Sequence, residues 1–516
     1  MSGPAAHAAI AVRMIGISKR FGAVAANADV NFSVPTATVH GLVGENGAGK
    51  STLMSVLYGF YQADSGSIEV FGKPATIRNA DDAIALGIGM VHQHFMLVDK
   101  LTALENVMLG AEPHWLLKRA DTQVRGKLIT LMQSTGLHVA LDALVADLPV
   151  GDRQRLEILK ALYRGAKILI LDEPTAVLTP QETEQLFDVL RVLREQGTTI
   201  LLITHKLKEV MRLCDQVTVM RAGRVVQELP IAQASCEGLA EAMVGRKVHM
   251  GRLDEEANVA GEVLLQATNL IVRDAMNVVR LSGLNLTLRG GEIVGVAGVS
   301  GNGQSELLDV LSGMLQPTAG QLQLGSKTFD ASSWLEPHSA RALGLAHVPE
   351  DRHARALVMD FVAWESAALG YDDLAEYASG VWMNHSQMRK ATSDMMERFD
   401  VRPRNPELLS RSFSGGNQQK LVLARELGQT PKVLLVGQPT RGVDIGAIEF
   451  IYAQLRAMRD AGCAVLVVSS ELDEILAISN RVIVMNQGRV TGELAIEDCT
   501  EASLGLLMVA DPELSA

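Results

Sequence analysis

The sequence predicts an α/β protein made of two similar halves, each with a largely parallel sheet covered by helices. Its length of 516 residues exceeds a single ordinary domain, which has about 100 to 200 residues. Short runs of Val, Ile and Leu alternate with amphipathic stretches, as is typical of parallel strands connected by helices. Three short motifs also occur twice in the same order, which indicates a duplication.

The duplication is visible at fixed spacings. The glycine-rich run that begins at Gly44 recurs at Gly298, 254 residues later. Leu-Asp-Glu-Pro-Thr at 171–175 and Ile-Thr-His-Lys at 203–206 both have counterparts 265 residues later. Composition alone does not produce three landmarks in one order at such similar spacings, so we infer a tandem repeat.

The repeat predicts two domains, at 8–245 and 262–508, joined by a linker at 246–261. The linker is charged and interrupts the apolar periodicity. A mainly helical insert is expected within each domain, at about 100–160 and 355–425. Four apolar runs are expected to be parallel strands: 167–171, 199–203, 433–436 and 464–468.

Composition and charge exclude several classes of protein. With 47 basic and 59 acidic residues the formal net charge is −12, so we expect no nucleic-acid partner. No apolar run reaches the roughly 18 to 20 residues of a membrane-spanning helix, and a membrane role would come through a partner. The four cysteines form no close pair of the metal or redox type, which fits a reducing, cytoplasmic compartment.

The most specific motif is a phosphate-binding loop of the form GxxxxGK[ST]. Its backbone N–H groups can turn toward phosphate oxygens, Lys50 supplies a cation for the β and γ phosphates, and Ser51 can bind Mg²⁺. The alternative is a glycine-rich turn with an exposed lysine. The expected positions are Gly44, Glu45, Asn46, Gly47, Ala48, Gly49, Lys50, Ser51 and Thr52.

Two carboxylates follow the apolar run at 167–171. Asp172 would face the magnesium shell, and Glu173 would accept a proton from an attacking water molecule. The alternative is an ordinary polar loop. The phosphate loop in the same half favours the catalytic interpretation.

With these motifs, the chain resembles the ATP-binding cassette (ABC) family over almost its whole length. The resemblance implies two tandem P-loop ATPase domains, each with a parallel-sheet core, a small antiparallel β part and a helical subdomain. It also implies that ATP and Mg²⁺ are held between two cassettes arranged head to tail. Each site then combines one phosphate loop with the signature segment of the other cassette.

Three further residues acquire roles from this resemblance. Gln93 looks like the glutamine that binds magnesium and senses the transport partner, and His205 looks like the histidine that contacts the γ-phosphate. Phe21 looks like the aromatic residue that stacks on adenine, with a core phenylalanine as the alternative.

The second half departs from the family pattern. Gln304 replaces the lysine, and Gly437 and Gln438 replace both carboxylates. Ser470 stands in the place of the histidine, and Glu350 in that of the magnesium-sensing glutamine. Loss of the lysine removes a charge-assisted contact of roughly 1.5 to 3 kcal/mol. We expect no fast hydrolysis at this loop.

The signature segments show the opposite asymmetry. In the first half Pro149 replaces the signature serine, and Thr179 replaces the acidic residue that survives in the second half as Asp444. Proline has neither a hydroxyl nor an N–H group to offer a phosphate. The second-half signature is Ser414, Gly415, Gly416, Asn417 and Gln418.

Head-to-tail pairing would bring every intact part into one composite site and every altered part into the other. Independent random substitutions would hardly place every altered residue in the same composite site. The resemblance therefore implies one hydrolytic site and one regulatory or structural site in each chain.

The chain resembles the energising subunits of simple-sugar importers through its fused cassettes and the segments 348–352 and 414–420. Segments 91–95, 101–107 and 438–442 resemble the purine-nucleoside branch. This implies two integral-membrane permease subunits, an extracytoplasmic solute-binding protein that acts through them, and a peripheral position on the cytoplasmic face of the membrane. The choice between sugar and nucleoside stays open.

Two other functions are considered. A twin-cassette translation factor would have two intact sites and a long basic linker, whereas this junction is short and mixed in charge. A nucleotide-binding scaffold without turnover would not need the complete set of catalytic residues in the first half.

Overall fold

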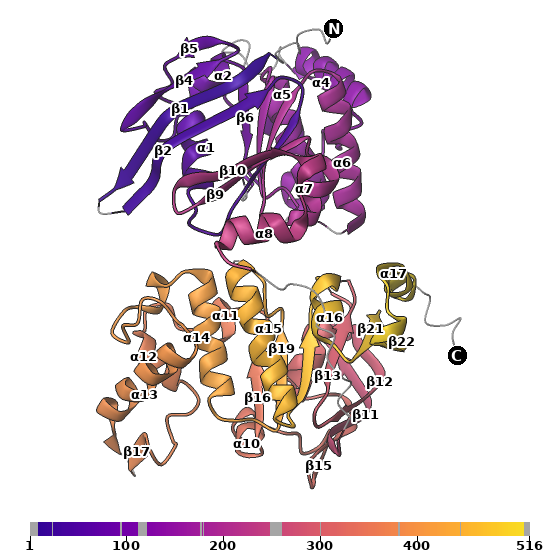
Figure 1. The fold of residues 1–516 in the computed structure, drawn as a ribbon. Coiled ribbons are helices and arrows are strands. Elements are labelled where there is room, and N and C mark those ends of the chain that lie inside the picture. Colours follow the sequence, from indigo (N-terminus) through magenta and orange to yellow (C-terminus); the bar gives the residue numbers. More distant parts are fainter. Residues whose placement is uncertain are drawn as a thin grey trace. The chain divides into compact units, whose positions relative to one another are not determined.

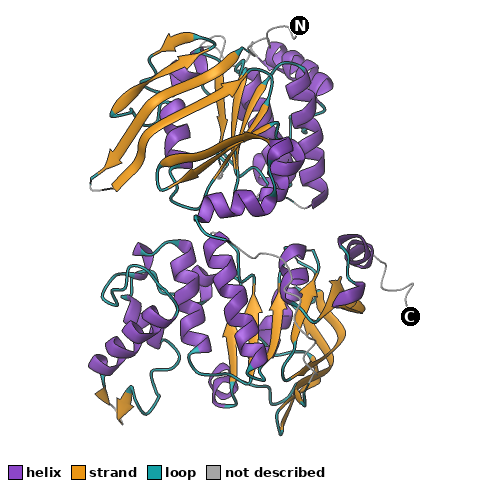
Figure 2. Cartoon of the chain, in the orientation of Figure 1, coloured by secondary structure: helices purple, strands orange, loops and turns teal. Residues whose placement is uncertain are grey.

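The computed structural model describes residues 9–22, 24–92, 95–111, 121–175, 178, 180–247, 261–299, 301–379, 382–443 and 445–509. The chain divides into two compact units, Met1–Val248 and His249–Ala516. Each unit has its own buried apolar clusters and combines sheets with flanking helices (Figure 1, Figure 2). Among the described residues, none of the helices has the length and apolar character that a membrane span requires.

The main sheet of the first unit has six strands in the order β10-β9-β3-β8-β7-β6. All neighbours pair in parallel except β9 and β10. Strands β3, β6 and β8 are buried along their full length, as expected for a sheet with both faces covered. The bounds are β3 Val39–Val43, β6 Ile88–Val91, β7 Ile168–Asp172, β8 Thr199–Ile203, β9 Gln216–Arg221 and β10 Arg224–Pro230.

A second, antiparallel sheet of the first unit has the order β2-β1-β4-β5. It shares an apolar core with α1 and the main sheet, built around Met14, Phe32 and Leu53. The strands are β1 Ile10–Phe21, β2 Val24–Pro35, β4 Ser65–Val70 and β5 Lys73–Ala75. The helices of the unit are α1 Lys50–Leu57, α2 Ala80–Ala85, α3 Ala103–Met108, α4 Asp121–Thr135, α5 Val150–Tyr163, α6 Pro180–Glu195, α7 Leu207–Leu213 and α8 Cys236–Val244.

The second unit repeats this plan. Its six-stranded sheet has the order β16-β19-β20-β13-β21-β22, and its antiparallel sheet has the order β12-β11-β14-β15. The main strands are β13 Ile293–Ala297, β16 Leu345–Val348, β19 Val433–Gly437, β20 Ala464–Val468, β21 Arg481–Asn486 and β22 Arg489–Ala495. The antiparallel strands are β11 Val263–Arg273, β12 Val279–Arg289, β14 Ala319–Leu324 and β15 Lys327–Asp330.

The helices of the second unit are α9 Gln304–Leu311, α10 Pro337–Ala342, α11 Arg352–Arg355, α12 Ala363–Ala368, α13 His385–Arg398, α14 Gly415–Leu427, α15 Ile445–Asp460, α16 Leu472–Ile478 and α17 Glu501–Val509. The described residues also include a short hairpin, β17 Ala378–Ser379 and β18 Trp382–Met383. No pattern in the sequence predicts this hairpin.

The predicted fold class is confirmed in detail. The four predicted strands correspond to β7, β8, β19 and β20, and both pairs are parallel neighbours. The described parts of both predicted inserts are mainly helical: α3, α4 and α5 pack together in the first unit, and α12, α13 and α14 in the second. The equal strand orders also confirm the duplication.

Candidate nucleotide-binding and catalytic site

The phosphate loop of the first unit connects β3 to α1, as the sequence predicts. Glycine is required at both ends of the loop because neighbouring backbone lies very close. A Cβ atom at Gly44 would lie 2.4 Å from the carbonyl oxygen of Met220, and one at Gly49 would lie 2.3 Å from that of Ala26. Gly49 also has a φ of 99°, a conformation that glycine adopts readily. The loop is therefore a tight cradle at the start of a helix.

Lys50 is buried at the base of this loop, with 6% of its surface exposed. Its Nζ donates hydrogen bonds to the carbonyl oxygens of Gly44, at 2.7 Å, and Glu45, at 3.0 Å. Burial lowers the pKa of Lys50, while the carboxylates of Glu173 and Asp172 oppose this change. The alternative of a turn with an exposed lysine is wrong.

Asp172 ends β7 and contacts the start of α1. Its carboxylate accepts a hydrogen bond from the Ser51 side chain. Burial raises the pKa of Asp172, and the neighbouring Glu173 raises it further. A hydroxyl beside a carboxylate is a donor set that suits Mg²⁺, which in such sites also binds substrate phosphates.

Glu173 follows Asp172 and has a φ of 46°. Its N–H donates to the carbonyl oxygen of Ile203 at 2.9 Å, which ties it to the end of β8. Its Oε1 lies 2.8 Å from His205 Nδ1. Burial raises the pKa of Glu173, but the hydrogen bond and charge of His205, with the charge of Lys50, lower it more. The carboxylate is therefore held ionised and oriented.

The remaining loop positions divide by exposure. Asn46, Gly47 and Ser51 are exposed and Ala48 is buried, with Thr52 between these extremes. This exposure leaves the middle of the loop open to solvent.

Phe21 ends β1 and is 44% exposed, so the alternative of a core phenylalanine is wrong. Its ring packs edge-on against Tyr61, with centroids 5.1 Å apart. The ammonium of Lys19 lies 5.7 Å from the same centroid. The contact of Phe21 with adenine stays a prediction.

Two predicted site residues, Gln93 and Asp444, lie outside the described residues, as does Thr179. The structure therefore does not place them relative to the other candidates.

Sequence reasoning missed Asn27. This residue of β2 is buried, and its Nδ2 donates to the carbonyl oxygen of Gly49 at 3.1 Å. The bond supports the end of the loop from which Lys50 projects. A comparison of the two halves could have found it, because the residue 254 positions later is Leu281.

The corresponding loop of the second unit keeps the backbone shape, and Gln304 bonds to the loop from the position of Lys50. Gly303 has a φ of 98°, close to that of Gly49. Gln304 Nε2 donates to the carbonyl oxygen of Val299 at 3.1 Å, and Gln304 Oε1 accepts the N–H of Asn302 at 3.1 Å. A neutral amide thus fills the place of the ammonium and occupies one backbone donor.

The pair formed by Glu173 and His205 also has neutral counterparts in the second unit. Gln438 has a φ of 48°, and its N–H donates to the carbonyl oxygen of Val468 at 2.7 Å. Its Oε1 accepts the hydroxyl of Ser470 at 3.1 Å. Gln438 thus has the backbone conformation of Glu173, but its neutral amide cannot act as a base.

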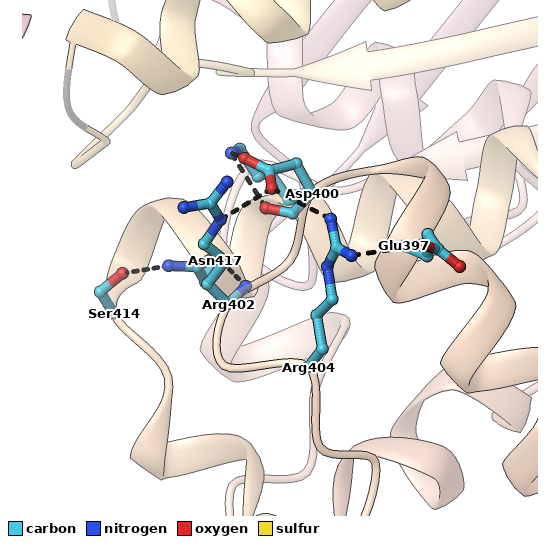
Figure 3. Close-up of polar contacts among 7 residues, drawn as sticks. Glu397, Asp400, Arg402, Arg404, Ser414 and Asn417 are labelled. Atoms are coloured by element: carbon cyan, nitrogen blue, oxygen red, sulfur yellow. Dashed lines mark hydrogen bonds and ion pairs between the residues drawn. The ribbon is translucent and has the colours of Figure 1, made fainter.

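The signature segment opens α14, with Ser414 at the N-cap position. Asn417 Nδ2 donates to Ser414 Oγ at 2.9 Å, and Asn417 Oδ1 accepts the backbone N–H of Arg402 at 2.6 Å (Figure 3). Asp400 Oδ1 in turn accepts a hydrogen bond from Arg402 Nε at 2.8 Å. The same oxygen lies 3.8 Å from Arg404 NH2. Asn417 therefore fixes the direction of the serine hydroxyl.

The rest of the signature is equally constrained. A Cβ atom at Gly415 would lie 2.7 Å from the carbonyl oxygen of Gly442. Gly416 is buried. Gln418 Nε2 donates to the carbonyl oxygen of Ser410 at 3.1 Å, and Gln418 Oε1 lies 2.8 Å from His353 Nε2. In the first unit, Pro149 occupies the same N-cap position on α5, and neither Pro149 nor Ser414 makes a side-chain cap.

Fold and site together define a P-loop nucleotide-binding protein with two cassette units, of which the first brings Lys50, Asp172, Glu173 and His205 together. A family model described as "ABC transporter" matches residues 28–176 and 281–441. The chain belongs to this family, and the resemblance predicted from the sequence is confirmed.

Relatives align along almost the whole chain. The nucleoside import ATP-binding protein NupA of Lactococcus lactis subsp. cremoris is 42% identical, over 96% of this chain and 98% of its own. The guanosine import ATP-binding protein NupO of Bacillus subtilis is also 42% identical, over 98% of both chains. The ribose import ATP-binding protein RbsA of Chromobacterium violaceum is 38% identical, over 96% of both.

A solved structure shares the fold over both units. The archaeal ribosome recycling factor aABCE1, in its complex with the ribosomal stalk protein aP1, gives a TM-score of 0.64 at 18% identity, over 95% of this chain and 92% of that chain. At this identity the likeness concerns the fold alone, so it does not favour a translation factor.

Proposed function

We propose that the chain is the ATP-hydrolysing, energy-coupling subunit of a membrane ABC importer for nucleosides, with simple sugars as the alternative solute. The full-length similarity to NupA and NupO supports a nucleoside as the transported solute. The similarity to RbsA supports ribose as the alternative solute. The observation that carries the proposal is the cluster of Lys50, Asp172, Glu173 and His205 in one unit.

In this proposal, the loop from Gly44 to Thr52 holds the phosphates of ATP, and Ser51 with Asp172 holds Mg²⁺, joined by Gln93. The metal neutralises charge on the phosphate oxygens. Glu173 accepts the proton of the attacking water. His205 keeps the Glu173 carboxylate turned and ionised and would contact the γ-phosphate.

We further propose that the signature of the second unit, Ser414 to Gln418, completes this site together with Asp444. The second phosphate loop would face Pro149 and Thr179. The sorting of intact and altered residues between the halves supports this pairing, as does the family resemblance. The domain bounds 8–245 and 262–508 belong to the same proposal.

The proposed partners are two permease subunits, served by an extracytoplasmic solute-binding protein, with this chain on the cytoplasmic face of the membrane. A groove of about 350 Å³ in the first unit offers a docking place for a short permease helix. Its apolar residues Phe60, Met96 and Leu109 are each about half exposed. Exposed apolar groups beside a concave surface are typical of such contacts.

Polar contacts hold this groove in shape. Glu157 Oε1 accepts the N–H of Met96 at 2.7 Å, and Lys160 Nζ donates to its carbonyl oxygen at 2.9 Å. The ring of His92 stacks on Phe60 with centroids 5.4 Å apart. The groove is therefore preformed, which lowers the entropic cost of docking.

Reconstitution tests the proposal. The chain is co-expressed with candidate permeases and the binding protein, and ATP-dependent uptake of labelled guanosine, adenosine and ribose is measured in vesicles. We expect uptake of a nucleoside that Glu173→Gln abolishes. Uptake of ribose alone would select the sugar alternative, and uptake that does not require ATP would refute the proposal.

A further inference from the structure

The second unit lacks the aspartate of the metal site, and the structure shows what fills its place. Gly437 ends β19 at the position that Asp172 has at the end of β7. A Cβ atom at Gly437 would lie 2.4 Å from Cγ of Glu350 and 3.0 Å from its backbone nitrogen. The Glu350 side chain thus occupies the space that an aspartate side chain would need.

Glu350 also makes the contact that the missing aspartate would make. Ser305 is the first residue after Gln304, as Ser51 is after Lys50. Ser305 Oγ donates to Glu350 Oε2 at 2.7 Å. In the first unit the corresponding partner of Ser51 is Asp172. A hydroxyl–carboxylate pair is present beside both loops, but in the second unit its carboxylate follows β16 rather than β19.

We infer that Glu350 supplies the metal-binding carboxylate of the second loop, so that this loop binds a Mg²⁺-nucleotide without hydrolysing it. The inference rests on the proposed function for the choice of nucleotide as ligand. Mg²⁺ binds one or two carboxylates together with substrate phosphates, and Ser305 with Glu350 offers one such carboxylate and a hydroxyl. Because Gln304 brings no charge, the metal carries more of the neutralisation of the phosphates here than beside Lys50.

The residues after Glu350 hold it in place. Asp351 caps α11 and accepts the N–H groups of His353 and Ala354 at 2.9 and 3.0 Å. Arg352 NH1 donates to the carbonyl oxygen of Arg441 at 2.8 Å. A carboxylate on a segment anchored in this way is oriented before the metal arrives.

The experiment uses the full chain with Lys50→Ala, which weakens nucleotide binding at the first loop. Bound Mn²⁺ is counted by electron paramagnetic resonance in the presence of ATP, and its affinity is measured by titration. We expect one ATP-dependent Mn²⁺ per chain, and a loss of affinity of roughly tenfold or more on adding Glu350→Gln. Glu306→Gln, in the first turn of α9, is the matched control and should leave the affinity unchanged.

A second variant places the carboxylate at the end of β19, the position that corresponds to Asp172 in the first unit. Glu350→Ala removes the Cγ atom nearest to position 437, so that the closest remaining contact is the flexible end of Leu308, with Cδ1 at 2.9 Å, which has to shift. Adding Gly437→Asp should then recover most of the Mn²⁺ affinity. Unchanged affinity in Glu350→Gln, or no ATP-dependent Mn²⁺ in the Lys50→Ala chain, would overturn the inference. The proposed function is judged separately, by whether Lys50→Ala alone abolishes ATP hydrolysis.

Discussion

Glu173 Oε1 lies 2.8 Å from His205 Nδ1, and the same two backbone positions of the second unit carry Gln438 and Ser470, 3.1 Å apart. The two pairs share a left-handed backbone at their first member. Only the first pair contains groups that can accept and hold a proton. The duplicated scaffold therefore repeats the geometry of this pair without its carboxylate and imidazole.

Replacement of the proposed general base should separate binding from turnover. Glu173→Gln keeps the shape of the side chain but cannot take a proton from water. We expect at least about a 100-fold fall in the ATPase rate, with ATP affinity retained in equilibrium titrations. Wild-type turnover in this variant would exclude Glu173 as the base.

The two phosphate loops should differ in their sensitivity to truncation. Lys50→Ala removes the buried ammonium that belongs to the catalytic loop and should reduce ATP use severely. Gln304→Ala removes a neutral amide and should have a mild effect. Both rates are compared under saturating MgATP, and equal losses would mean that the second loop is catalytic.

The proposed pairing of the first phosphate loop with the signature of the second unit can be tested separately. Ser414→Arg should suppress hydrolysis nearly as strongly as Glu173→Gln, because the serine would bind γ-phosphate oxygens only in the closed state. Pro149→Arg, at the N-cap of α5, should leave much of the turnover. Nucleotide binding is measured separately for each variant. A severe defect in Pro149→Arg beside near-normal Ser414→Arg would reverse the pairing.

Docking to the permease should depend on the groove of the first unit. Phe60→Asp places a charge beside Met96 and should reduce copurification with the permeases, with ATP binding unchanged. Phe71, in the turn between β4 and β5, is 40% exposed, and Phe71→Asp is the matched control. Equal copurification of both variants would place the docking surface elsewhere.

Glu474 makes stability depend on pH. It lies in α16 with 2% of its surface exposed, and burial raises its pKa from 4.5 to about 7. The folded state thus binds this proton more tightly than the unfolded state. The contribution to stability is full below about pH 4.5 and is lost as the pH rises through about 7.

Glu474→Gln should therefore raise the Tm at pH 8 and flatten its decline between pH 5 and 8. Asp473→Asn changes an exposed carboxylate on the same helix and should not alter this profile. Thermal denaturation of the three chains across this pH range provides the measurement. A lower Tm for Glu474→Gln at pH 8 would contradict the assignment.

Much of the fold follows from local pattern. The runs that form β7, β8, β19 and β20 are short and continuously apolar, which only strands buried on both faces require. The hairpin of β17 and β18 could not be predicted, because each strand has two residues and no alternation can be read from so few.

The candidate site residues were predictable where their spacing was that of a motif, as for Lys50 and Asp172. Asn27 was not, since one amide in a strand matches no motif, and only its replacement by Leu281 in the second half marks the position. In the sequence, Glu350 is visible only as a replacement of the glutamine that the family pattern has at this position. That it fills the space beside Gly437 depends on the packing of β16 against β19, which a linear reading does not contain.

The short segment from Glu350 to His353 contacts two functional elements of the second unit. At one end Glu350 meets Ser305 of the phosphate loop, and at the other His353 meets Gln418 of the signature helix. Under thermodynamic linkage, a ligand that binds the phosphate loop and shifts this segment changes the free energy of ligand binding at the signature helix. A ligand at the signature helix changes the free energy of binding at the phosphate loop by the same amount. In the proposed pairing, the nucleotide affinity of the second loop would then follow the state of the composite site that the signature completes.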